Sequence, residues 1–302
     1  MADRMQADRF SPMGVGVTVL MIAGLLALIS GCETKKQARA PGGSEQNSVG
    51  VDSGTTPGTS ETGGGEAGGS PKQKFGSVAL TGIVKIAGAP ARVALDISAK
   101  PECGKQREAQ SLGPLNAETI VAGADGGLKD CIVYISKGLG RYNLKDMATY
   151  GHPAKVVIDQ KGCQYIPHVF ALHKDQQVVL RNSDPFLHNV SIPQLSFNLS
   201  MANVGEEVRD RFFKKAGPHV CQCSVHPWMS AYAFVVKNPF FSQTAEDGKF
   251  SIGKLPDGDG TYTVEVWHEK DRKLKAPKAQ KITVKDGAVV EGNIVFEFTY
   301  KG

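Results

Sequence analysis

The chain has 302 residues, enough for about two domains, and carries 35 Lys and Arg against 30 Asp and Glu. This mildly basic balance contains no long basic run, so it excludes an obvious nucleic-acid-binding protein. Six cysteines and 35 glycines are the other marked features of the composition, and much of the glycine falls in one early stretch. The positions of the cysteines and of that Gly-rich stretch are therefore the best guide to how the chain is divided into segments.

Residues 1–31 are expected to be a targeting segment. Arg4 and Arg9 precede an apolar run, MGVGVTVLMIAGLLALIS, and the run leads into LISGC, which ends at Cys32. This pattern resembles a bacterial lipoprotein signal, which implies cleavage before Cys32 and attachment of lipid to its thiol. A plain transmembrane anchor is the alternative, because the run is near the lower limit for spanning. Both interpretations predict a chain that is exported and tethered to a membrane of the cell envelope. The residue after Cys32 is Glu33 and not Asp, which favours the outer membrane.

Residues 32–74 are expected to form a flexible tether. They consist of Gly, Ser, Thr, Pro and charged residues and contain almost no large apolar side chain. Such a segment cannot bury enough surface to offset the entropy of ordering it. For a Gly-rich chain of this length the root-mean-square reach is about 35 Å.

From about residue 75 onward the pattern predicts an all-β protein. Runs of four to eight apolar or alternating residues, rich in Val, Ile, Phe and Tyr, are separated by turn signals such as EDGK, PDGDG and KDGA. No long amphipathic helix is expected. Short strands at this spacing favour β-sandwiches.

Two separate stretches resemble parts of one module. The stretch TAEDGKFSIGKLPDGDGTYTVEVWHEK with KITVKDGAVVEGNIVFEF, and the earlier GSVALTGIVKIAGAPARVAL, are similar to a carboxypeptidase regulatory-like (transthyretin-like) domain. The resemblance implies that residues 75–149 and 239–302 complete one β-sandwich. Residues 150–238 would then be an insertion or a closely packed partner of that sandwich.

Four cysteines are available for disulfides if Cys32 carries lipid and Cys223 binds a metal. Four cysteines in an exported protein indicate two disulfides, with three connectivities open. Pairing cysteines in similar contexts gives one bond between the loop-like positions and one between the strand-like positions. The pairs expected are Cys103–Cys163 and Cys131–Cys221.

The stretch CQCSVHPWM, residues 221–229, indicates a metal site. Cys223, His226 and Met229 follow one another at intervals of three in a loop broken by Pro227, so one turn could direct their side chains at a common centre. His188, in NSDPFLHNV, would join them if the two strands are neighbours. Two imidazoles, a thiolate and a thioether are the donor set of blue copper, whereas zinc prefers four strong ligands. Taken alone, Met229 is better explained by core packing and His188 as a turn histidine, and Cys223 could pair with another cysteine. Only their combination favours the metal.

The middle segment resembles a cupredoxin. HVFALHKDQQVVLRNSDPFLHNV followed by CSVHPWM is similar to the amicyanin and plastocyanin group, and the Cys-x-x-His-x-x-Met spacing resembles the short ligand loop of amicyanins. The resemblance implies a Greek-key β-sandwich over residues 150–238, holding one type 1 copper ion with His188, Cys223, His226 and Met229. It also implies that Asn189 donates its backbone N–H to the Cys223 sulfur.

A site closed by four protein ligands leaves no position for a substrate, so we expect electron transfer rather than catalysis. Electrons would pass through an exposed edge of His226, to a cytochrome or copper oxidase docked briefly on a small apolar patch. A copper storage or delivery protein and an envelope-binding module remain as alternatives. A multicopper enzyme would need additional His-x-His pairs, which the sequence lacks. The docking patch would comprise Phe186, Pro193, Pro227 and Trp228.

Overall fold

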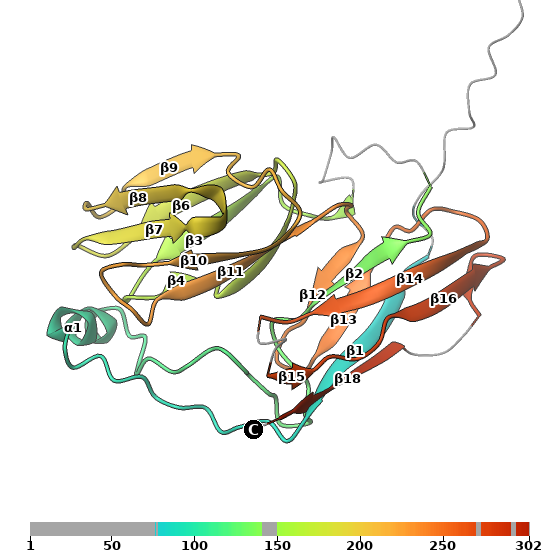
Figure 1. Ribbon diagram of the computed structural model, residues 1–302, viewed down its shortest axis with the longest axis horizontal. Coiled ribbons are helices and arrows are strands. Elements are labelled where there is room, and N and C mark those ends of the chain that lie inside the picture. Colours follow the sequence, from blue (N-terminus) through green and yellow to red (C-terminus); the bar gives the residue numbers. More distant parts are fainter. Residues whose placement is uncertain (1–75, 77, 141–149, 270–272, 291–293, 302) are drawn as a thin grey trace, which may run out of the picture. The chain divides into compact units, whose positions relative to one another are not determined.

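A computed structural model describes residues 76, 78–140, 150–269, 273–290 and 294–301 (Figure 1). The expected targeting segment, the tether and the lipidation site Cys32 lie outside the described residues. Within the described ranges, no helix combines the length and the apolar character needed to cross a membrane.

The described chain is built almost entirely of strands, so the predicted all-β class is confirmed. The elements in chain order are β1 (Leu80–Ala87), α1 (Pro101–Ala109), β2 (Ile132–Lys137), β3 (Lys155–Gln160), β4 (Tyr165–Ile166), β5 (Val169–His173), β6 (Gln177–Asn182), β7 (His188–Ile192), the 3-10 turn η2 (Pro193–Leu195), β8 (Phe197–Met201), β9 (Glu207–Asp210), β10 (Gly217–Gln222), β11 (Ser230–Val236), β12 (Phe241–Gln243), β13 (Lys249–Ile252), β14 (Gly260–Trp267), β15 (Leu274–Lys275), β16 (Gln280–Lys285), β17 (Ala288–Val289) and β18 (Ile294–Tyr300).

Two sheets are formed by strands from the beginning and the end of the described chain. Their orders are β13-β1-β18-β15 and β12-β2-β14-β16-β17. Alternation along the strands places one set of side chains inside, and β18 shows this with Phe296 and Phe298 buried between exposed neighbours. β1 pairs in parallel with β18, although more than 200 residues separate them in sequence. The transthyretin-like identity of these sheets stays a prediction.

The other two sheets are formed by strands of residues 155–236. Their orders are β5-β11-β10-β7-β8 and β4-β3-β6-β9 (Figure 1). Their inward side chains, among them Ile158, Leu180 and Val190, form a separate buried cluster. β7 pairs with β10 at Ser191 and Gln222. The start of β7 therefore lies beside the loop that follows β10, which is where the sequence predicts the metal ligands.

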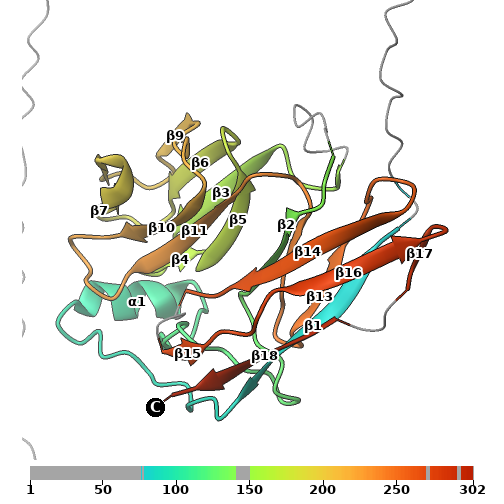
Figure 2. The same ribbon diagram turned by 45° about the vertical axis from the view of Figure 1, so that its right-hand side comes forward.

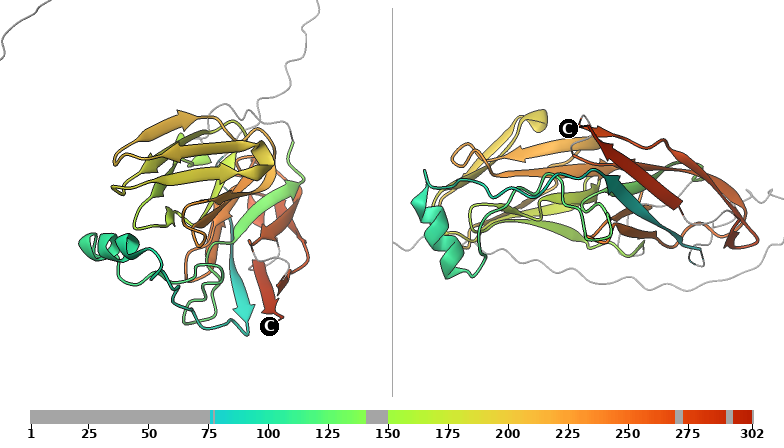
Figure 3. Two further views of the ribbon diagram at one scale, coloured as in Figure 1. Left: turned by 60° about the vertical axis from the view of Figure 1, so that its left-hand side comes forward. Right: turned by 90° about the horizontal axis from the view of Figure 1, so that it is seen from below.

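The helix α1 interrupts the long connection from β1 to β2. Pro101 at its first position, Glu102 in the first turn and Arg107 in the last turn are favourable helix-end residues. Figure 2 shows the connection between β1 and α1 running without regular structure. The helix lies by the strand group that contains β4 and β10 (Figure 1 and Figure 3), and its Cys103 belongs to the buried cluster of that group.

One of the two expected disulfides is confirmed and the other is wrong. Cys103 in α1 is bonded to Cys163 in the loop between β3 and β4. Cys131 and Cys221 are both free and buried. The pairing by similar context fails because these two cysteines belong to the cores of different sandwiches, so each packs as a small apolar side chain.

A glycine substitution tests the close approach of β1 and its neighbours. A Cβ on Gly82 would lie 2.2 Å from the Ile294 carbonyl oxygen and 2.6 Å from the Phe250 ring. Gly82→Ala should therefore lower the free energy of unfolding by about 1 to 3 kcal/mol in denaturant melts. Gly253→Ala, where a Cβ meets nothing within 4 Å, is the matched control and should change it by no more than about 0.5 kcal/mol. Equal effects would mean that the packing around Gly82 is looser than described.

Candidate metal centre

The turn between β6 and β7 places His188 at the first position of its strand. Asn182, which is fully buried, organises the turn through its side chain. Its Oδ1 accepts the backbone N–H of Asp184 at 3.0 Å, and its Nδ2 donates to the Phe186 and Met201 carbonyls at 3.1 Å. Such side-chain-to-backbone bonds are the usual means by which Asn fixes a turn. His188 therefore enters β7 from a defined direction and points inward.

The loop between β10 and β11 carries the other expected ligands. The Met229 N–H donates to the His226 carbonyl at 2.9 Å, and the Cys223 N–H donates to the Met229 carbonyl at 3.2 Å. These two bonds curl the segment from Cys223 to Met229 into one compact turn. Cys223, His226 and Met229 are all buried by it.

Asn189 ties the two ligand-bearing segments together. Its Oδ1 accepts the Ser224 N–H at 2.6 Å, and its Nδ2 donates to Asn198 Oδ1 at 2.7 Å. Its backbone N–H is hydrogen-bonded to the Cys223 sulfur, as the resemblance to cupredoxins implies. The loop after β10 is thus held against the beginning of β7 by two bonds to Asn189, at Ser224 and Cys223, and the bond to Asn198 fixes the Asn189 side chain against β8.

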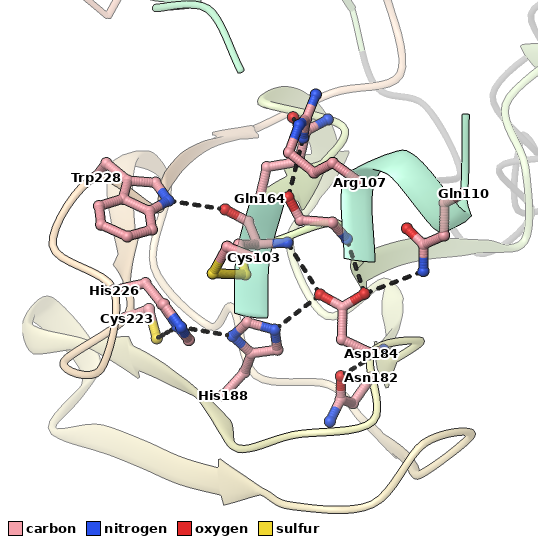
Figure 4. The surroundings of a disulfide bond; sticks show 12 residues. Cys103, Arg107, Gln110, Gln164, Asn182, Asp184, His188, Cys223, His226 and Trp228 are labelled. Atoms are coloured by element: carbon pink, nitrogen blue, oxygen red, sulfur yellow. Dashed lines mark hydrogen bonds and ion pairs between the residues drawn. A yellow bond between two sulfur atoms is a disulfide. The ribbon is translucent and has the colours of Figure 1, made fainter. Parts of the chain in front are cut away.

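Three of the four predicted ligands converge in space (Figure 4). The donor atoms of His188, Cys223 and His226 all lie within 4.8 Å of one another. His188 Nδ1 lies 3.0 Å from His226 Nδ1, and Cys223 Sγ lies 3.8 Å from the same nitrogen. Met229 is buried in the same apolar cluster as Cys223, and its role as a fourth ligand stays a prediction.

The surroundings of Cys223 favour the thiolate. Burial by itself raises the pKa of this thiol. Hydrogen bonds from the side chains of His188 and His226 and from the backbone N–H groups of Asn189 and His226 outweigh burial and lower the pKa to about 5. Cys221, two residues earlier, has no such donors, and burial raises its pKa to about 12. Of these two thiols, Cys223 is therefore the one prepared to bind a metal near neutral pH.

A buried carboxylate, Asp184, fixes the orientation of His188. The His188 Nε2–H donates to Asp184 Oδ2 at 2.9 Å, so Nδ1 is the nitrogen turned toward Cys223 and His226. Asp184 also accepts the backbone N–H groups of Gly162 and Cys163 at 2.8 and 2.9 Å. Burial raises the pKa of this carboxyl, but the bond from His188 and the two backbone bonds lower it overall. Burial lowers the pKa of His188, and Asp184 and then Cys223 raise it overall.

This role of Asp184 is not among the expectations from the sequence. The carboxylate four residues before the proposed ligand His188 could have indicated it, because metal-ligating histidines commonly donate their other ring N–H to a carboxylate. The position of the Cys163 loop, which supplies the other two donors, cannot be inferred from sequence spacing.

The expected exposed edge of His226 is wrong, because the His226 side chain is enclosed. The residue is 1% exposed, and its Nε2 has no hydrogen-bond partner among the described residues. Phe186 and Trp228 pack around the ring with centroid distances of 6.1 and 5.5 Å. A ring nitrogen of His226 lies within 4.8 Å of both sulfurs of the Cys103–Cys163 disulfide. Of the residues expected in the docking patch, Pro193 and Pro227 are exposed, whereas Phe186 and Trp228 are half-buried.

The residues present fit a copper ion. A metal ion at about 2.0 to 2.3 Å from nitrogen and sulfur donors separates those donors by roughly 3 to 4 Å, which matches the spacing of the two Nδ1 atoms and the sulfur. Two imidazoles and one thiolate, with a methionine nearby, form the set preferred by copper that cycles between Cu(I) and Cu(II). All three donor residues are also buried, and closure of the site by Met229 as a fourth ligand stays a prediction.

Comparisons with known proteins give partial structural similarities. No family model matches the sequence, and no curated protein matches it. A copper-containing nitrite reductase from Thermus scotoductus SA-01 is 20% identical over 34% of this chain, with a TM-score of 0.24, and the chain spans only 26% of its length. A purple cupredoxin from Nitrosopumilus maritimus is 22% identical over 28% of this chain and all of its own, with a TM-score of 0.24. An amicyanin from Paracoccus versutus is 18% identical over 34% of this chain and 97% of its own, with a TM-score of 0.25. TM-scores of this size establish no common fold for the whole chain.

The lowered pKa of Cys223 can be measured in metal-free protein. The ultraviolet absorbance of the thiolate should rise with pH through about 5, in one step that is lost in Cys223→Ser. Cys221→Ser should keep the step, because the pKa of that thiol is about 12. A step near the ordinary value of 9.0 instead would show that the two histidines do not direct donors at the sulfur.

The carboxylate of Asp184 should be essential to the stability of the site. Asp184→Asn places an amide N–H among buried donors and removes the charge that pairs with His188, so the free energy of unfolding should fall by about 3 kcal/mol or more. Asp159→Asn is the matched control, because Asp159 accepts only the Ser183 hydroxyl, at 2.8 and 2.9 Å, and the loss there should be about 1 kcal/mol or less. Denaturant unfolding of the two variants separates these outcomes, and similar small losses would refute the anchoring role.

Proposed function

We propose that the chain is a membrane-tethered blue copper protein that carries single electrons between redox partners in the cell envelope. The observation that supports this most directly is the convergence of His188, Cys223 and His226 in one buried centre. Such a centre leaves no opening for a substrate, which argues for electron transfer and against catalysis.

The protein prepares this centre before any metal enters. Asp184 holds the His188 ring with Nδ1 inward, and Asn189 holds the two segments that carry Cys223 and His188 in register. The lowered pKa of Cys223 supplies the thiolate without an additional base. A bound copper ion would supply the one-electron couple between Cu(I) and Cu(II). Because the ligands are fixed by packing and hydrogen bonds, they need to move little between the two states, which favours rapid electron transfer.

A redox partner would dock on the surface formed by Phe186 and Leu187, because the His226 ring is not itself exposed. The Phe186 ring packs on both imidazoles, with centroid distances of 5.3 Å to His188 and 6.1 Å to His226. Its neighbour in sequence, Leu187, is 44% exposed and presents an apolar side chain to the solvent. A small apolar contact of this kind suits brief docking of a cytochrome or a copper oxidase.

The proposed location in the envelope rests on the sequence. The apolar run within residues 1–31 and the LISGC segment imply a lipid anchor on Cys32, and residues 32–74 would let the folded part reach partners above the membrane. Export would also agree with a disulfide between Cys103 and Cys163.

A visible spectrum tests the proposed function. Protein loaded with one equivalent of Cu(II) should show an intense absorption in the orange-red region, because charge passes from the Cys223 thiolate to the metal. Cys223→Ser should abolish the colour, and Cys221→Ser, two residues away, should retain it. A colourless wild-type protein would contradict the proposal. Colour with a rapid loss of copper to a chelator in both oxidation states would favour storage or delivery instead.

The axial role of Met229 has a separate test. Met229→Leu should keep the colour and raise the reduction potential measured by voltammetry, because a weak donor to Cu(II) is removed. The two residues are close in volume, so the packing of the loop should be retained. An unchanged potential would show that Met229 belongs to the core and not to the metal centre.

A further inference from the structure

The metal centre carries a cover that comes from a distant part of the sequence. We define the cover as residues 101–114, which comprise α1 and the turn that follows it. In Figure 4 the Cys103–Cys163 disulfide lies beside His226, between the ligand loop and α1. A ring nitrogen of His226 lies within 4.8 Å of both sulfurs, and all three residues are buried. The disulfide therefore contributes to the enclosure of His226, together with Phe186 and Trp228.

Few non-covalent contacts hold the cover in place. Within α1 only Cys103 and Arg107 are buried. Arg107 donates to the Gly162 carbonyl and to Gln164 Oε1, both at 2.9 Å, and Gln110 Nε2 donates to Asp184 Oδ1 at 3.1 Å. A segment with little buried apolar surface and a handful of polar contacts opens locally at a low cost in free energy. The covalent bond from Cys103 to Cys163 is therefore the main restraint on the cover.

We propose that the Cys103–Cys163 disulfide is a thiol–disulfide exchange site whose partner is a dithiol, and that its state governs access to the metal centre. One thiol of the dithiol attacks a sulfur of the protein disulfide, forms a mixed disulfide and releases the other cysteine as a thiol. The second thiol of the dithiol then displaces the remaining cysteine. Two electrons and two protons pass from the dithiol to Cys103 and Cys163, and the dithiol becomes a disulfide.

Opening of the cover changes what can reach the copper ligands. With the disulfide closed, His226 is 1% exposed and its Nε2 meets no hydrogen-bond partner among the residues described. With the disulfide reduced, the cover is restrained by the hydrogen bonds of Arg107 and Gln110 and by the packing of Leu112 against Gly162, so that local opening lets solvent and small chelators approach His226. The chain would then change from a closed electron carrier to a form that exchanges its metal. This second part rests on the proposed function, whereas the exchange reaction itself does not.

The exchange site is tested on folded, metal-free, full-length protein. Treatment with dithiothreitol without denaturant, followed by alkylation and peptide mass spectrometry, should label Cys103 and Cys163. Cys131 is an internal control, because it is buried in the core of the other sandwich and becomes labelled only if that core unfolds. If dithiothreitol reduces the disulfide only when Cys131 is also labelled, reduction requires unfolding and the disulfide has a purely structural role. That result would overturn the proposal.

Access to the metal is tested by copper transfer. Protein reduced with dithiothreitol is freed of it under anaerobic conditions and loaded with one equivalent of Cu(I), and transfer to bicinchoninate is followed by absorbance. Transfer should be roughly tenfold faster than from the disulfide-bonded protein, a factor equivalent to about 1.4 kcal/mol. The double variant Cys103→Ser/Cys163→Ser should show the fast rate without any reductant, and Cys131→Ser should show the wild-type rates in both states. Equal rates for the reduced and oxidised wild-type protein would overturn the role as a gate.

The two proposals fail in distinguishable ways. Absence of the orange-red absorption in the disulfide-bonded protein would count against the copper carrier and would leave the alkylation result unaffected. A coloured protein with a disulfide inert to dithiothreitol would retain the carrier and remove the exchange site. If the double variant does not fold, the comparison of reduced and oxidised wild-type protein decides the question alone.

Discussion

The candidate metal centre depends on one constraint, namely that the beginning of β7 and the loop after β10 are held side by side. The two segments pair directly only at Ser191 and Gln222, and Asn189 adds the bonds that lock them. Without this contact His188 and Cys223, which are 35 residues apart in sequence, would have no reason to share a centre. The pairing of the strands therefore fixes the separation of the donor atoms of His188 and Cys223 before any metal binds.

Asp184 extends this constraint to the cover. Its carboxylate receives the ring of His188, the backbone of the Cys163 loop and the side chain of Gln110 just beyond α1. A single buried charge thus connects a proposed metal ligand, a disulfide loop and a helix that enters from the connection between β1 and β2. Buried charges are stable only when they are fully hydrogen-bonded, and these donors meet that requirement.

The local parts of this architecture could be predicted from the sequence, and the contacts between remote parts could not. Alternating apolar residues indicated the strands, and the spacing of Cys223, His226 and Met229 indicated a ligand loop, because both are short-range patterns. The enclosure of His226 escaped prediction because the covering helix is short, has almost no apolar face and comes from about 120 residues earlier in the chain. The pairing of Cys131 with Cys221 failed for a related reason, since similar strand-like contexts do not reveal that two cysteines lie in different cores.

The central claim, that His188, Cys223 and His226 bind one copper ion, is tested most directly by X-ray absorption at the copper edge. The account predicts two nitrogen neighbours at about 2.0 Å and one sulfur neighbour at about 2.2 to 2.3 Å, close to the distances that these ligands adopt with a metal of similar size. The sulfur neighbour should disappear in Cys223→Ser, and one nitrogen should disappear in His188→Ala. A copper shell without sulfur in the wild-type protein would contradict the account.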